Sequence, residues 1–264
     1  MTAPLIDLPD DPQPLPLDLA RRLNGMRKDR RRRLLQGLYL LAHTGYPLAV
    51  ELRACLAANL FIRPQNGGLQ RLFQVDLPES GLVVSQKLPF IRGSRLTLLR
   101  LTEAGEDVCR QLGWETAENE WQRLIDDHRG EDLPLHTAGL LAFCFQVRRR
   151  GWEVELLPQA SESVEPDVAV RKGDPGWLYV EFETEPRGKF EKWRKAYEFQ
   201  GLVAVAALTP GRCRRLVEEC RQSAASGVAT DLQTLSSGNA ASSLWQTSWR
   251  NRYDDGSRLN GWIG

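Results

Sequence analysis

The stretch VEPDVAVRKGDPGWLYVEFETEPRGKFEKWRKAYE, residues 164–198, decides the fold of the second half of the chain. Two apolar runs, PDVAV and WLYVEFET, flank the turn sequence RKGDPG, a pattern typical of a β-hairpin. Pairing these runs around Asp174 places Asp167 opposite Glu181, with the two side chains roughly 5 Å apart. Alternation along the second run puts Glu183 on the same face as Glu181. The sequence therefore predicts three acids gathered at one place on a sheet.

Facing carboxylates repel each other unless their site holds a proton or a cation. Hard oxygen ligands suit magnesium or manganese, so Asp167 and Glu181 are the expected metal ligands. A helix follows, and its Lys189, Lys192 and Lys195 flank an apolar stripe, so at least one ammonium group is expected to reach the carboxylates. In a phosphodiesterase the metal activates a water and polarises the phosphate, while a lysine neutralises charge in the transition state.

Each acid also has a plain structural interpretation, which stays open. Asp167 suits the start of a strand, and Glu181 and Glu183 suit the wet side of a half-exposed strand. His136 is interpreted first as a residue that begins a helix and second as a site residue. Glu165 is a further candidate because it directly precedes the Pro-Asp pair.

The elements around the acids predict an α/β domain over residues 133–225. An apolar helix, LHTAGLLAFCFQVRRRG, precedes strands WEVELLP, PDVAV and WLYVEFET, the lysine-bearing helix, strand LVAVAALT and a last helix. From residue 226 onward Ser, Gly, Asn and Thr accumulate, with Trp245, Trp249 and Trp262 as apolar exceptions. We therefore expect residues 226–264 to form a tail.

The first half of the chain predicts a different domain over residues 19–115. Three helical patterns are followed by a hairpin, GLVVSQKLPF and RLTLLRL around the turn IRGS, and by the closing helix TEAGEDVCRQLG with Thr102 as its N-cap. Three helices, a two-stranded wing and a last helix make a winged helix-turn-helix. Residues 1–18, rich in Pro and Asp, are expected to form a mobile lead, and residues 116–132 a linker helix.

A winged helix-turn-helix predicts contacts with duplex DNA. Clustered guanidinium groups displace counterions from the DNA backbone. LLRLTEAGEDVCRQLG resembles bacterial winged-helix DNA-binding domains, and this resemblance implies that amide or guanidinium groups on the third helix read base edges. A solvated helix start, or use of the fold for protein contact, are the alternatives. The expected DNA-binding residues are Arg30, Arg31, Arg32, Arg33, Asn66, Gln70, Arg71 and Lys87.

Two family resemblances support this division. LLRLTEAGEDVCRQLG resembles the wing and last helix of many bacterial winged-helix DNA-binding domains, over roughly residues 33–113. Glu165-Pro166-Asp167, a hairpin, then Glu181-x-Glu183 resemble the PD-(D/E)XK nuclease superfamily with its αβββαβ core, over about residues 133–220. That resemblance implies that Asp167 and Glu181 are metal ligands.

The chain departs from the nuclease pattern at one position. Glu183 stands where the superfamily has a lysine, and some members carry that lysine on the following helix. Lys192 or Lys195 is therefore the expected substitute, with Glu183 kept among the catalytic candidates. The same departure is expected of a site that has lost activity.

The whole chain is also similar to bacterial replication-relaxation proteins, which are associated with plasmids and mobile elements. The similarity rests on a winged helix followed by LPLHTAGLLAFCFQVRRRGWEVE, EPDVAV and YVEFETE. In that family a histidine begins the first helix of the second domain, and His136 matches it.

Composition restricts the cellular setting. Thirty-five Lys plus Arg nearly cancel 34 Asp plus Glu, so net charge alone indicates no partner. Five scattered cysteines form no disulfide pattern or zinc motif, which favours a reducing cytoplasm. The acidic, proline-rich start is unlike a secretory signal, and no apolar run approaches the roughly 20 residues that span a bilayer.

Together these features predict a cytoplasmic DNA-binding protein with a Mg²⁺- or Mn²⁺-dependent endonuclease domain, belonging to a mobile element or a defence system. The alternative is a non-catalytic replication or transcription accessory factor. A third class is a subunit that cleaves DNA only within a larger nucleoprotein assembly. The sequence leaves the target site and the oligomeric state open.

Overall fold

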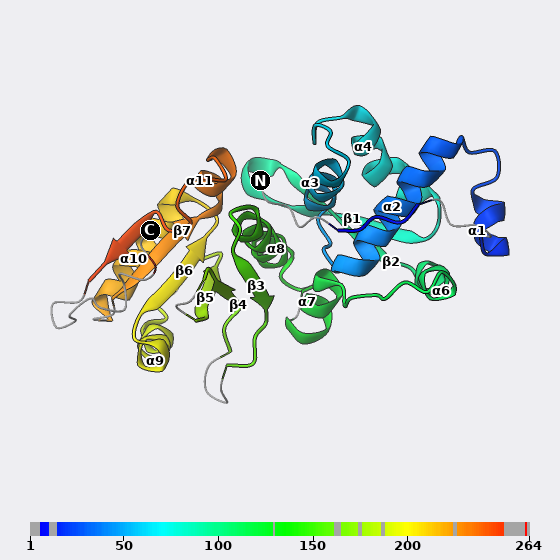
Figure 1. The fold of residues 1–264 in the computed structure, drawn as a ribbon. Helices are drawn as coiled ribbons and strands as arrows, with labels where there is room; N and C mark the ends of the chain where they lie inside the picture. Colours follow the sequence, from blue (N-terminus) through cyan, green and yellow to red (C-terminus); the bar gives the residue numbers. More distant parts are fainter. Residues whose placement is uncertain are drawn as a thin grey trace. The chain divides into compact units, whose positions relative to one another are not determined.

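The structure is a computed structural model that describes residues 6–10, 15–128, 130–160, 165–173, 176–185, 188–223, 226–250 and 262. It is mixed α/β, as predicted, and divides into two compact units (Figure 1). The N-terminal unit consists mainly of residues 3–89 and 94–137, and the C-terminal unit of residues 138–264. None of the helices in the described part of the chain has the length and apolar character needed to cross a bilayer.

The N-terminal unit is built from helices and one hairpin, and its elements α2 to α6 follow the predicted order, whereas α1 was not predicted. Thr102 caps the last helix of the predicted hairpin-helix segment by accepting the N–H of Gly105 at 3.1 Å. The third helix is irregular, because a π-helical turn separates its two α-helical parts. The elements are α1 (Leu17–Arg22), α2 (Lys28–Thr44), α3 (Ala49–Asn59), α4 (Gly67–Arg71), the π-helical turn (Leu72–Asp76), α5 (Leu77–Glu79), β1 (Val83–Pro89), β2 (Arg95–Leu101), α6 (Glu103–Gln111) and α7 (Glu120–His128).

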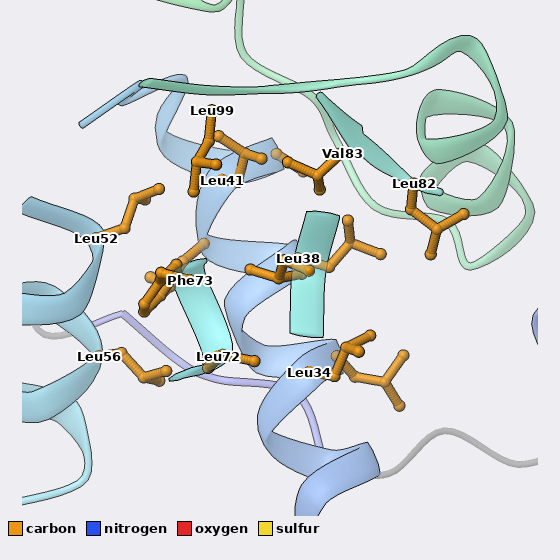
Figure 2. Close-up of a cluster of buried hydrophobic side chains, with 14 of the residues drawn as sticks. Leu34, Leu38, Leu41, Leu52, Leu56, Leu72, Phe73, Leu82, Val83 and Leu99 are labelled. Atoms are coloured by element: carbon orange, nitrogen blue, oxygen red, sulfur yellow. The ribbon is translucent and has the colours of Figure 1, made fainter. Parts of the chain in front are cut away.

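Leucines at helical spacing on α2 and α3 form the core of the N-terminal unit. They pack against the third helix and the hairpin, so that one apolar cluster joins α2, α3, the third helix and the hairpin (Figure 2). The residues labelled there are Leu34, Leu38, Leu41, Leu52, Leu56, Leu72, Phe73, Leu82, Val83 and Leu99.

The expected mobile lead is wrong for the part of it that the structure describes. Ile6, Leu8 and Leu15 pack against the leucine core, and the backbone N–H of Ile6 donates to Oδ1 of Asn59 at 2.8 Å. The sequence did not predict this packing, because the three apolar residues stand among prolines and aspartates and are spaced too irregularly to indicate a helix or a strand.

The C-terminal unit is one six-stranded sheet with helices, and every strand pairs with its neighbour in sequence. β3, β4 and β5 pair antiparallel, β5, β6 and β7 pair parallel, and β8 pairs antiparallel with β7. The elements are α8 (Pro134–Arg149), β3 (Glu153–Leu156), β4 (Val168–Arg171), β5 (Leu178–Glu183), α9 (Phe190–Gln200), β6 (Val203–Ala207), α10 (Pro210–Gln222), β7 (Gly227–Asp231), α11 (Leu232–Ser237) and β8 (Thr247–Trp249).

Helices cover both faces of this sheet. Trp193 of α9 and Leu216 of α10 pack against Val205 of β6 on one face. On the other face Gly139 of α8 lies so close to Phe182 of β5 that a Cβ there would sit 2.5 Å from the ring. The sheet is therefore buried on both sides, and its central strands are apolar accordingly.

The expected tail is wrong for residues 226–250, because they contribute β7, α11 and β8 to the fold. The rest of the expected tail, apart from Trp262, lies outside the described residues. At Gly227 the neighbouring strands pack too closely for a side chain. A Cβ there would lie 2.1 Å from the carbonyl oxygen of Val203 and 2.6 Å from the Trp249 ring. Trp245 and Trp262 both contact Trp152 through their rings. All three tryptophans are therefore anchors of the C-terminal unit.

Candidate functional site

β4 and β5 bring the predicted acids together. The two strands pair in the predicted register, with Val168 opposite Val180, so that Asp167 falls opposite Glu181 one step further along. The backbone N–H of Phe182 donates to Oδ2 of Asp167 at 2.7 Å, which fixes this carboxylate across the strand pair. Asp167, Glu181 and Glu183 are all buried, which excludes the interpretation of wet-face residues.

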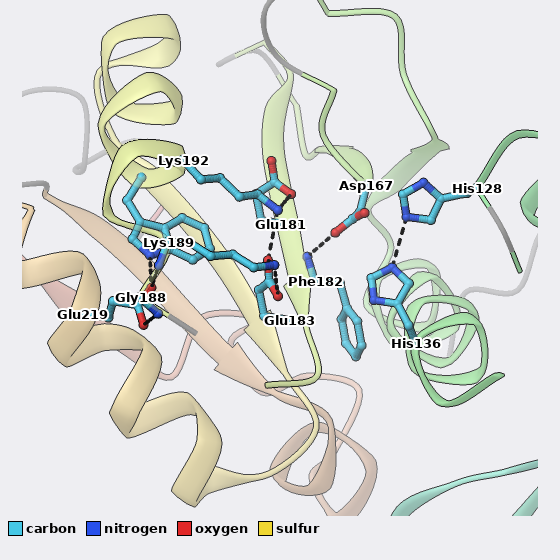
Figure 3. A network of polar contacts seen from close by, with 11 residues as sticks. His128, His136, Asp167, Glu181, Phe182, Glu183, Gly188, Lys189, Lys192 and Glu219 are labelled. Atoms are coloured by element: carbon cyan, nitrogen blue, oxygen red, sulfur yellow. Dashed lines mark hydrogen bonds and ion pairs between the residues drawn. The ribbon is translucent and has the colours of Figure 1, made fainter. Parts of the chain in front are cut away.

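Two lysines from the start of α9 enclose the glutamates (Figure 3). Nζ of Lys192 lies 2.7 Å from Oε2 of Glu181 and 2.9 Å from Oε1 of Glu183. Nζ of Lys189 donates to both carboxylate oxygens of Glu183, at 2.7 and 2.8 Å. Glu183 therefore holds two ammonium groups beside β5.

Burial and crowding set the protonation of this site. Burial, and after it the charge of Asp167, raise the pKa of Glu181 to about 7, although Lys192 opposes the shift. Burial alone lowers the pKa of Lys192, but the charges of Glu181, Asp167 and Glu183 outweigh it and raise that pKa above its ordinary value. The charge of Asp167 contributes to both shifts, because three carboxylates and two lysines share this site. The site therefore favours any added positive charge.

Glu219 of α10 holds the lysine-bearing segment in place, and the sequence prediction missed it. Its carboxylate accepts the backbone N–H groups of Gly188 at 3.0 Å and Lys189 at 2.6 Å, and the indole N–H of Trp193 at 2.7 Å. The available signal was its place on α10, three residues after Leu216 on the apolar face of the helix. A buried carboxylate with three donors fixes where α9 begins.

The remaining candidates of the C-terminal half lie elsewhere or have other partners. Lys195, one turn beyond Lys192 on α9, is exposed, as is Glu165 before the Pro-Asp pair. His136 lies in the first turn of α8, and its Nε2 is 3.3 Å from Nε2 of His128, a partner that the sequence did not predict. Of the lysines considered, Lys189 and Lys192 are the two that the structure brings to the acids.

Two of these carboxylates, Asp167 and Glu181, are the ligands that the sequence predicts for a divalent cation. Oε2 of Glu181 is shielded from solvent, and within the described residues it meets Lys192 as an ion pair without a hydrogen bond of good geometry. Asp167 and Glu181 together offer hard oxygen ligands on adjacent strands, which suits Mg²⁺ or Mn²⁺. These two residues would hold the ion, which would polarise a phosphate and acidify a bound water.

In the N-terminal unit, two of the expected DNA-binding arginines share one buried aspartate, Asp76. Arg30 donates to both carboxylate oxygens of buried Asp76, from Nη2 at 2.6 Å and from Nε at 3.2 Å. Nε of Arg71 donates to Oδ1 of the same carboxylate at 3.2 Å. The expectation that Arg71 reaches freely to base edges is therefore weakened by its tie to Asp76.

The other expected DNA-binding residues have varied surroundings. Arg32 pairs with Asp10 at 2.6 Å, and Asn66 caps α4 by accepting the N–H of Gly68 at 2.9 Å. Gln70 donates to Gln74 at 3.4 Å. Arg31 is half-buried, whereas Arg33 on α2 and Lys87 on β1 are exposed.

Comparison with known proteins gives no match: no family model fits the chain, and no curated protein or solved structure is detectably similar to it. The functional interpretation therefore rests on the geometry of the two units.

Proposed function

We propose that the protein is a metal-dependent endonuclease that binds duplex DNA. One observation carries the proposal: buried Asp167 and Glu181 face each other across β4 and β5, and Lys192 contacts Glu181 at 2.7 Å. Carboxylates on adjacent strands with a lysine beside them supply the parts needed for phosphodiester hydrolysis.

The order of elements supports the same proposal. α8, β3, β4, β5, α9 and β6 follow one another in the αβββαβ order of the PD-(D/E)XK core. β7, α11 and β8 then extend the sheet beyond that core. In the N-terminal unit, three helical segments, the β1–β2 hairpin and α6 follow the order of a winged helix-turn-helix. The backbone of Pro47, between α2 and α3, also accepts the N–H of Leu99 at 2.8 Å, which ties these helices to the hairpin.

Each residue of the site has a proposed role. Asp167 and Glu181 hold Mg²⁺ or Mn²⁺, and Lys192 supplies positive charge toward the scissile phosphate. Glu183 binds Lys189 and Lys192. It thereby holds two ammonium groups of the following helix at the site, in place of a lysine on the strand itself. Duplex DNA is the proposed partner, and a cytoplasmic mobile element or defence system is the proposed setting.

A second candidate function is a non-catalytic DNA-binding accessory factor. The observation that favours it is the way both lysines are ion-paired to carboxylates, with Glu183 alone contacting Lys189 and Lys192. In such a network the lysines compensate part of the carboxylate charge without a metal ion, as expected of a nuclease fold that is retained for binding.

A plasmid-nicking assay tests the first candidate. Purified protein with Mg²⁺ or Mn²⁺ should convert supercoiled DNA to nicked or linear DNA, and Asp167→Asn or Glu181→Gln should abolish this. Glu198→Gln is the matched control, because Glu198 lies exposed on α9. Nicking that survives both site substitutions would show that Asp167 and Glu181 do not form the cleavage site. Duplex binding without metal-dependent nicking would favour the accessory factor.

A further inference from the structure

Four arginines line a hollow in the N-terminal unit. The cavity has a volume of about 490 Å³ and is formed by the start of α2 and by the third helix. Its four arginines outnumber its two aspartates, which gives the lining a formal net charge of +2. The charged residues are Arg27, Asp29, Arg30, Arg33, Arg71 and Asp76, and we call this cavity the arginine pocket.

Asp76 holds two of these guanidinium groups in place before any ligand binds. Its side chain is 5% exposed, whereas those of Arg30 and Arg71 are 43% and 61% exposed. Each guanidinium group has five N–H donors in a fixed plane, and Asp76 occupies two on Arg30 and one on Arg71. The remaining donors belong to groups whose position is already fixed, so little conformational entropy is lost on binding.

The other two arginines supply the excess charge. Within the part of the chain that the structure describes, neither Arg27 nor Arg33 has an ion-pair partner. Gly68 leaves room for Arg33 at the edge of the pocket, since a Cβ at Gly68 would lie 3.2 Å from Nη1 of Arg33. An exposed, positively charged hollow with clamped guanidinium groups suits a compact, multivalent anion.

We propose that the arginine pocket binds a phosphate group. Guanidinium forks match the paired oxygens of a phosphate in both geometry and charge. Under the DNA-binding function proposed above, on which this assignment of the source rests, the group is a backbone phosphate of the duplex. Arg71 then positions the N-terminal unit on the DNA instead of reading base edges. The pocket chemistry itself applies equally to a free phosphorylated ligand.

Two measurements on the full chain, both without divalent metal, test the pocket. The first is the salt dependence of duplex binding, followed by fluorescence anisotropy, for the wild type, Arg33→Ala, Arg27→Ala and Arg33→Lys. Arg110→Ala is the matched control, because Arg110 is an exposed arginine on α6. The second is the shift in melting temperature caused by inorganic phosphate, against chloride at equal ionic strength.

For a backbone phosphate, Arg33→Ala and Arg27→Ala should each weaken duplex binding about tenfold and lower the salt slope by about one. Arg33→Lys should keep the slope and recover part of the affinity. If the two alanine variants instead abolish stabilisation by phosphate without changing duplex binding, the pocket takes a free phosphorylated ligand.

The proposal is overturned if both alanine variants behave as Arg110→Ala does toward the duplex and if phosphate does not stabilise the wild type. Far-UV circular dichroism of each variant shows that it is folded. Since no metal is present, a failure of the nuclease proposal leaves these results unaffected, and a failure here does not touch Asp167 or Glu181.

Discussion

Nζ of Lys192 lies 2.7 Å from Oε2 of Glu181 on β5. The same ammonium group also contacts Glu183, two positions further along that strand. One lysine therefore contacts both the proposed metal ligand Glu181 and the neighbouring acid Glu183. This arrangement makes the charge of α9 part of the site, and it decides which substitutions should matter.

The structure selects Lys192 over Lys195 as the lysine of the site. Lys192→Met should reduce metal-dependent nicking by about 10²- to 10³-fold, because a fixed positive charge next to the reacting phosphate is lost. Lys195→Met, one turn along the same helix, should retain most of the activity since Lys195 is exposed. Initial nicking rates decide the matter, and a reversed order of the two variants would contradict the placement.

Glu219 should be needed for the stability of the lysine-bearing segment. Glu219→Gln weakens three hydrogen bonds to a buried carboxylate, and we expect the free energy of unfolding to fall by about 1–3 kcal/mol. Glu218→Gln is the matched control, because its neighbour Glu218 is exposed. Urea unfolding followed by tryptophan fluorescence measures both, and equal midpoints would refute the role of Glu219.

The raised pKa of Glu181 predicts that the metal-free protein loses stability as pH rises. An unfolded chain releases this proton near pH 4.5 and the folded chain near pH 7, so between them the folded state binds more protons. Stability should therefore fall across that window, by up to about 3 kcal/mol. Melting temperatures from pH 4.5 to 8 should show this fall in the wild type and a smaller one in Glu181→Gln.

The same group predicts how cation binding depends on pH. A divalent ion at Glu181 competes with the proton, so affinity for Mn²⁺ should rise about tenfold per pH unit below pH 7 and level off above it. Calorimetric titration at several pH values checks this. Binding that is independent of pH, or that persists in Asp167→Asn with Glu181→Gln, would place the ion elsewhere.

Gly139 should tolerate no side chain. Gly139→Ala puts a Cβ about 2.5 Å from the ring of Phe182, so β5 or α8 must shift, at a cost of about 1–3 kcal/mol in stability. Gly211→Ala in α10 is the matched control, because a Cβ there meets nothing within 4 Å. Chemical unfolding should separate the two variants clearly, and a neutral Gly139→Ala would show that the helix packs less closely than described.

The sequence predicted most of the local structure for identifiable reasons. The turn RKGDPG and the alternation of WLYVEFET determine the register of β4 and β5, so the meeting of Asp167 and Glu181 follows from local pattern. The choice between Lys192 and Lys195 did not follow, because helical periodicity places both lysines near the apolar stripe. It depends on where α9 begins, which the distant Glu219 determines.

Contacts between distant segments account for what the sequence did not reveal. Asp76 resembles an ordinary polar residue of a helix, yet it binds Arg30 from 46 positions away. Likewise, Gly227 begins β7 without a side chain, because Val203 and Trp249 approach it too closely for one. Composition predicts how exposed a segment is on average. Asp76 and β7 are buried because distant parts of the chain pack against them.

The pairing of β8 with β7 has a practical consequence for protein production. A clone stopped at residue 225, where the small-residue segment begins, would lack both strands and leave the β6 edge with unpaired backbone groups and a bare apolar surface. Such a fragment is expected to accumulate in inclusion bodies. Deletions intended to trim this region should therefore spare β7, β8 and also Trp262, whose ring packs on Trp152.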